Sequence, residues 1–158
     1  MILVADCSAL VALSICDSLH LLEQLFDSVA VPETVYREAT EPDKPQAQAL
    51  KQFLQGKIHP VDLRNYVFLD AFADAGETEA MVLYKQLSAD KLLIDDRRGR
   101  KVAKINQIDT IGSLGILLAA KAKGILPEVS PLLRQIEQSD IYLSPDLITT
   151  VLELAGEI

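Results

Sequence analysis

The sequence predicts an α/β fold, a three-layer sandwich in which helices cover both faces of a central parallel sheet. Short apolar runs without polar alternation recur along the chain, which is typical of strands buried on both faces of a parallel sheet. Segments with helical spacing separate these runs, and such alternation predicts an α/β architecture. The chain has 158 residues, 49% of them hydrophobic, and a mean hydropathy of +0.20, enough for one sizeable core. We therefore expect a single domain over 1–158, with an α/β core at 1–111 and a helical tail at 112–158.

Five apolar runs are the expected strands of the sheet. They are ILVA at 2–5, SVAV at 28–31, KIHPV at 57–61, KLLI at 91–94 and IDTI at 108–111. KIHPV has the weakest pattern, because Pro60 confines a run to a sheet edge or excludes it from the sheet.

Segments with helical spacing lie between and after the strands. Before the last strand they are SLHLLEQLF at 18–26, PETVYREA at 32–39, ETEAMVLYKQL at 77–87 and RRGRKVAKI at 97–105. A turn or loop is expected at 41–48, and 63–76 is expected to lead into the helix at Glu77. From Gly112 onward the pattern predicts only helices, SLGILLAAKAKG, PEVSPLLRQIEQS and SPDLITTVLELAGE, the last with Ser144 as its N-cap and Pro145 at its first position.

The composition limits the classes of protein to which the chain can belong. A net charge of −8 and a pI near 4.7 argue against nucleic-acid binding by the whole surface, so any such contact must be local. The N-terminal apolar run is interrupted by Asp6 and has no basic segment before it, so we expect neither a signal peptide nor a membrane span. Cys7 and Cys16 fit free thiols in a reducing compartment, and we expect a cytoplasmic protein.

Acidic residues stand at the ends of apolar runs, or in the helical turn beside one, at four separate places: Asp6, Glu38, Glu77 with Glu79, and Asp95 with Asp96. Because ligands bind outside the carboxyl ends of parallel strands, we expect Asp6 and the Asp95–Asp96 pair at one edge of the sheet. Glu77, in the first turn of its helix, can point over the same edge. Converging carboxylates repel one another unless a cation lies among them, and oxygen-only ligands favour Mg²⁺ or Mn²⁺ over zinc.

Each acidic residue also has an ordinary explanation. Glu77 can stabilise a helix dipole, Glu38 can be a solvated surface residue, and Asp6 and Asp96 can be helix N-caps. The joint pattern of two strand-end aspartates with GETEA favours a site over these separate alternatives.

A basic strip follows the last acidic pair. Five cations fall within eight residues: Arg97, Arg98, Arg100, Lys101 and Lys104. Such a run is ordinarily a solvated helix face. Its position directly after Asp96 also fits the steering of phosphates towards the acidic residues.

This ordered set of motifs resembles the PIN-domain nucleases. Asp6 after the first strand, the VPETV helix start before Glu38, GETEA and LLIDDRRGRKVA are most similar to short prokaryotic PIN-like proteins with GE-x-EA and IDD signatures. The resemblance covers almost the whole chain, including IGSLGILLAAKAKG and LITTVLELAGE. It implies a magnesium- or manganese-dependent endoribonuclease, and many small prokaryotic members are toxins of toxin–antitoxin pairs.

The resemblance also implies roles for individual residues. The catalytic, metal-binding carboxylates would be Asp6, Glu38, Glu77 and Asp96, and Ser8 fits the hydroxyl that the family commonly has two residues after its first aspartate. The position of the basic strip, rather than the resemblance, makes Arg97, Arg100 and Lys101 the expected substrate-binding cations. Glu79 and Asp95 remain alternative metal ligands, because neighbours two apart on a helix, or adjacent at a strand end, point in different directions.

Partners and alternatives follow from the same set of observations. The implied partners are RNA and a small antitoxin protein. The high apolar fraction with only 5% aromatic residues predicts a homodimer or larger assembly. The alternative function is a catalytically inactive PIN-like binding or scaffold protein.

Overall fold

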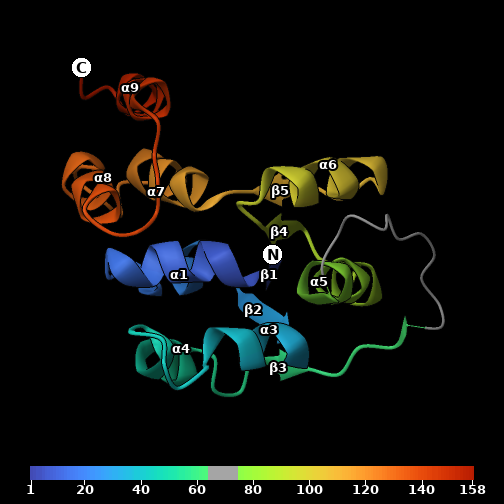
Figure 1. The fold of residues 1–158 in the computed structure, drawn as a ribbon. Coiled ribbons are helices and arrows are strands. Elements are labelled where there is room, and N and C mark those ends of the chain that lie inside the picture. Colours follow the sequence, from blue (N-terminus) through green and yellow to red (C-terminus); the bar gives the residue numbers. More distant parts are fainter. Residues whose placement is uncertain (64–74) are drawn as a thin grey trace.

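A computed structural model describes residues 1–63 and 75–158, and in these ranges a five-stranded parallel sheet is surrounded by nine helices (Figure 1). The strands are β1 (Ile2–Ala5), β2 (Ser28–Pro32), β3 (Ile58–His59), β4 (Lys91–Leu93) and β5 (Thr110–Ile111). All five strands were predicted. The weakest, β3, keeps only two residues before Pro60 and lies at the edge of the sheet.

The helices follow the predicted segments with two additions, Cys7–Ile15 and Ala47–Phe53. They are α1 (Cys7–Ile15), α2 (His20–Leu25), α3 (Glu33–Ala39), α4 (Ala47–Phe53), α5 (Ala75–Gln86), α6 (Arg97–Ile105), α7 (Ser113–Ala122), α8 (Ser130–Glu137) and α9 (Pro145–Leu154). The sequence did not predict α4, whose first two residues lie in the expected loop at 41–48. The expected lead into α5 at 63–76 lies mostly outside the described residues. None of the described helices has the length and apolar character needed to cross a membrane.

Two hydrophobic clusters, one on each face of the sheet, establish the predicted three-layer sandwich. Alternate residues of the central strand divide between them: Leu3 and Ala5 belong to one cluster, and Val4 to the other. The first cluster includes side chains of α1, α2, α3, α4, α7, α8 and α9, and the second those of α5 and α6. In Figure 1, α1, α4, α7 and α8 of the first group lie on one side of the strands, and α5 and α6 lie on the other.

The strand order places a ligand crevice beside the first strand. The order is β3-β2-β1-β4-β5, so the chain builds outward from β1 in one direction and then crosses to the other side through β4. Ala5 and Leu93 are register partners at the carboxyl ends of β1 and β4. In open parallel sheets, ligands bind where the strand order reverses, which here is the edge between these two strand ends.

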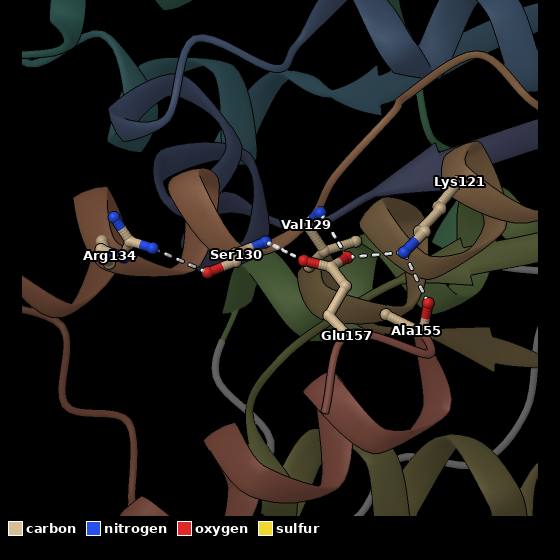
Figure 2. Close-up of polar contacts among 6 residues, drawn as sticks. All are labelled: Lys121, Val129, Ser130, Arg134, Ala155 and Glu157. Atoms are coloured by element: carbon tan, nitrogen blue, oxygen red, sulfur yellow. Dashed lines mark hydrogen bonds and ion pairs between the residues drawn. The ribbon is translucent and has the colours of Figure 1, made fainter.

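The C-terminal segment is tied to the helices before it through Glu157 (Figure 2). The Glu157 carboxylate accepts hydrogen bonds from the amides of Val129 and Ser130, at 2.8 and 2.9 Å, and from Lys121 Nζ at 2.9 Å. Lys121 also donates to the carbonyl of Ala155 at 2.6 Å. One carboxylate therefore joins the end of α7, the start of α8 and the segment after α9.

Candidate functional site

Asp6 lies immediately beyond β1, at the centre of the sheet. Its amide donates to the Leu93 carbonyl of β4 at 2.8 Å, which extends the β1–β4 ladder by one bond. Asp6 is 5% exposed. It occupies the N-cap position of α1, but its side chain makes no capping hydrogen bond there. Its explanation as a helix cap is therefore wrong.

The two aspartates after β4 make different contacts. Asp95 accepts from the Ser113 amide and from the Ser113 hydroxyl, both at 2.7 Å, and so uses both oxygens to anchor the start of α7. Asp96 is the N-cap of α6, and its Oδ2 accepts from the Gly99 amide at 2.8 Å. A carboxylate has two oxygens, so this cap leaves Oδ1 of Asp96 for another partner.

Glu77 is the third residue of α5 and is 6% exposed. Its position depends on Gly99, because a Cβ on that glycine would lie 2.7 Å from Glu77 Oε2 and 2.5 Å from Ile94 Cδ1. The Gly99 amide also holds Asp96. Gly99 therefore forms a cradle at which the carboxylates of Glu77 and Asp96 meet.

The remaining predicted ligands come from α3, α5 and α1. Glu38 on α3 is half-buried and faces the same hollow as Asp6 and Glu77. Glu79 accepts a hydrogen bond from the Thr34 hydroxyl and is not among the residues that line this hollow. Ser8, exposed in the first turn of α1, does line it.

These side chains surround a hollow of about 340 Å³ at the β1–β4 edge, which we call the acidic hollow. It is lined by Asp6, Cys7, Ser8, Glu38, Glu77, Asp95 and Asp96. The pKa of the Cys7 thiol is raised to about 12, mainly because the thiol is buried and secondly because of the negative charge of Glu38. The thiol is therefore no nucleophile at neutral pH, and the acidic hollow has a negative field.

The donors of the acidic hollow fit a hard divalent cation, since carboxylate and hydroxyl oxygens predominate among them. As they stand, no three acidic, histidine or cysteine side chains in the described part of the chain are close enough to hold a metal ion. A three-carboxylate centre would therefore require side chains to move towards the ion, which a cation favours by offsetting their mutual repulsion.

A second hollow, of about 760 Å³, shares Asp95 with the acidic hollow. We call it the basic groove, because Arg97, Arg100, Lys101 and Lys104 line it. These side chains are exposed on α6, and within the described ranges they form no ion pair. The predicted substrate-binding cations thus lie together next to the acidic residues, whereas Arg98 is not part of the lining.

Sequence reasoning missed three residues of this region. Gly99 had a usable signal, since a glycine in the first turns of a helix costs roughly 0.5–1 kcal/mol relative to alanine and so suggests a close contact. Ser113, the partner of Asp95, is distant in sequence. Lys44, which donates to the Glu38 carbonyl at 2.9 Å, lies in a segment that the sequence predicts only as a loop.

Comparison with protein-family models identifies the family of the chain. The model of a family described as a PIN domain matches residues 2–157, which is nearly the whole chain. Among the curated proteins, none matches the sequence.

Proposed function

The chain belongs to the PIN-domain family, and on that premise we propose that it is an endoribonuclease that hydrolyses RNA phosphodiester bonds. Members of this family are in general divalent-metal-dependent nucleases. The observation that carries the proposal is the convergence of Asp6, Glu38, Glu77 and Asp96 on one hollow at the switch point of the sheet.

The residues that would hold the metal are Asp6, Glu77 and Asp96. A separate contact positions each of them. The backbone of Asp6 is bonded to Leu93, Glu77 packs against Gly99, and Asp96 caps α6. Such supports position carboxylates before a substrate arrives. Bound Mg²⁺ or Mn²⁺ supplies a Lewis acid for the phosphate and lowers the pKa of water.

Two further side chains of the acidic hollow can act on the reacting groups. Glu38 is half-buried and reaches solvent, so its carboxylate can take a proton from the attacking water. The exposed hydroxyl of Ser8 can donate a hydrogen bond to a phosphate oxygen.

The substrate would approach over the basic groove. The net charge of −8 repels RNA from most of the surface, whereas Arg97, Arg100 and Lys101 are exposed cations that form no ion pair within the described residues. These three side chains would bind phosphates on either side of the bond that is cleaved.

We also propose two protein partners. A small antitoxin protein would cover the acidic hollow, and a short gene adjoining this one would support that pairing. A second copy would cover exposed apolar side chains of the C-terminal segment such as Leu154 and Ile158, both 71% exposed. Light scattering at micromolar concentration is expected to give a dimer or larger assembly, and a monomer would contradict it.

A catalytically inactive PIN-like binding protein is the second candidate function. The observation that favours it is the spacing of the carboxylates, since no three of them in the described residues form a ready metal site. A protein of this kind would bind RNA through the basic groove without cleaving it.

Cleavage of labelled single-stranded RNA in Mn²⁺ decides between the two functions. The parent protein is expected to cleave, EDTA to stop cleavage, and Asp6→Asn to abolish it without loss of thermal stability, because one of several repelling charges is removed. Asp17→Asn is the matched control, since it removes the same charge from an exposed position at the far end of α1. An unaltered rate for Asp6→Asn would exclude the nuclease assignment, and RNA binding without cleavage by the parent would favour the inactive alternative.

A further inference from the structure

An apolar hollow of about 430 Å³ lies beside the basic groove, between the start of α7, α8 and the segment before α9. Its lining includes Ile136, Ile141, Leu143 and Leu147. Tyr142 also lines it and is 81% exposed, more than any other large hydrophobic side chain in the described residues. An aromatic ring left in solvent at the edge of an apolar hollow is suited to contact a ligand.

The apolar hollow continues the surface of the proposed site. It shares Arg100, Thr110 and Leu147 with the basic groove, and Asp95 lines both of these and the acidic hollow. A Cβ on Gly112, at the start of α7, would lie 3.5 Å from Arg100 Nη1, so the guanidinium lies at the boundary between the apolar hollow and the basic groove. A ligand could therefore contact the acidic, basic and apolar regions at once.

We propose that the apolar hollow binds an unpaired base of single-stranded RNA whose phosphates lie on the basic groove. This inference rests on the proposed function and specifies its substrate class. Exposed cations continue from the rim of the apolar hollow along α6, which complements a polyanion. The base would stack on Tyr142, and Arg100, which lines both the apolar hollow and the basic groove, would bind the adjoining phosphate.

This arrangement makes the binding surface selective for single strands. A base inside an RNA duplex is paired and stacked and cannot enter a hollow, whereas an unpaired base can be turned out onto an aromatic ring. Stacking tolerates all four bases, so the apolar hollow would distinguish strandedness rather than sequence.

The absence of tryptophan from the chain permits a direct test. In Tyr142→Trp, the single indole is expected to be quenched in a saturable way by an oligouridylate in EDTA, and not by an RNA duplex of equal length. Ile58→Trp is the matched control, since Ile58 is 40% exposed on β3, at the opposite edge of the sheet from β5. Its emission is expected to stay constant.

Affinity gives a second readout under the same conditions. Tyr142→Ala is expected to weaken binding of the oligouridylate by about 5- to 150-fold, as removal of one stacking side chain does. Tyr142→Phe, which keeps the ring, and Ile58→Ala are expected to bind as the parent does.

Three results with RNA present would overturn the inference: no quenching of Tyr142→Trp, equal quenching by duplex and single strand, or parental affinity in Tyr142→Ala. A blue shift of Tyr142→Trp that depends on protein concentration without RNA would assign the apolar hollow to a second copy, and would also overturn it. The test needs no hydrolysis. Quenching without cleavage in Mn²⁺ would remove only the nuclease proposal, and cleavage without quenching would remove only this inference.

Discussion

At the residue scale, the two neighbouring aspartates after β4 differ in how many of their oxygens accept hydrogen bonds. Both carboxylate oxygens of Asp95 accept hydrogen bonds from Ser113 at the start of α7, whereas only one oxygen of Asp96 accepts the bond that caps α6. The second oxygen of Asp96 is the one that can serve a cation in the acidic hollow.

Asparagine substitutions separate these two tasks. Asp95→Asn is expected to lower the free energy of unfolding by about 1–2 kcal/mol, because a charge-assisted hydrogen bond to Ser113 is lost. Asp96→Asn is expected to keep its stability, since asparagine is an equally good N-cap. The Mn²⁺ affinity of Asp96→Asn is expected to fall by at least about tenfold. Mutation of a residue that only supports a metal ligand already lowers metal affinity by this much, and Asp96 would itself be a ligand.

Urea unfolding and Mn²⁺ calorimetry on both variants check this division. A larger loss of metal affinity in Asp95→Asn than in Asp96→Asn would show that Asp95, and not Asp96, is the metal ligand.

Gly99 supports a second prediction at this scale. In Gly99→Ala the new methyl group meets Glu77 Oε2 and Ile94 Cδ1, so the carboxylate must move. Crowding of this kind costs about 1–3 kcal/mol, offset by the roughly 1 kcal/mol that alanine gains over glycine in a helix. We expect slightly lower stability and clearly weaker Mn²⁺ binding.

Arg98→Ala, the exposed neighbour of Gly99, provides the control and is expected to leave both quantities unchanged. Parental Mn²⁺ affinity in Gly99→Ala would show that the Gly99 cradle does not position Glu77.

Several residue-level features lay beyond the sequence. The rule for parallel strands placed Asp6 and the Asp95–Asp96 pair at one edge, but it does not say which way a side chain turns. The bond from Thr34 to Glu79 and the bonds from Ser113 to Asp95 join segments distant in sequence. Nothing in the local pattern of GETEA or IDD could therefore predict these contacts.

At the element scale, Glu157 acts as an external cap for α8. Its carboxylate accepts hydrogen bonds from two backbone amides at the start of that helix and from the ammonium group of Lys121 on α7. The hydrogen bond from Lys121, followed by the Val129 amide, lowers the pKa of Glu157 from 4.5 to about 2. The ionised form is therefore the one that stabilises the fold.

The lowered pKa fixes the pH range of this stabilisation. It is fully present above the ordinary pKa of 4.5 and is lost as pH falls towards 2. Glu157→Gln is expected to lower the free energy of unfolding by about 1–3 kcal/mol at pH 7, and by less at pH 3.

Urea unfolding of parent and variant at the two pH values measures the difference. Glu153→Gln, on the exposed face of α9, is the control and is expected to have little effect at either pH. An equal deficit of Glu157→Gln at pH 7 and pH 3 would contradict the role of the charge.

The sequence predicted the elements better than their lengths. The five apolar runs and the main helices were evident because buried strands and amphipathic helices have clear periodicity. The helix α4 was missed, since it follows the proline-rich segment 41–46 and Leu50 is its buried residue. A single buried position gives almost no periodic signal.

At the scale of the whole molecule, the proposed function requires an acidic protein to bind an acidic polymer. The net charge is −8, and the cations of the basic groove lie on one helix beside the acidic hollow. The attraction between the cations of the basic groove and the RNA phosphates must therefore exceed the repulsion caused by the net negative charge.

The salt dependence of RNA binding measures this local attraction. The double substitution Arg100→Gln with Lys101→Gln is expected to weaken binding of all single-stranded sequences alike and to reduce the slope of log K against log salt by about 1–2. The double substitution Lys51→Gln with Lys85→Gln changes the charge equally at exposed sites on α4 and α5 and serves as the control. Identical slopes for the two double variants would show that the basic groove is only a solvated helix face.

The central claim is that the carboxylates at the ends of β1 and β4 form the metal centre of a nuclease. Anomalous diffraction from crystals soaked in MnCl₂ tests it most directly. The account predicts a manganese peak within about 2.0–2.6 Å of carboxylate oxygens of Asp6, Glu77 and Asp96, the range found for hard-cation ligands. A peak elsewhere, or none in the acidic hollow at a saturating concentration, would contradict the account.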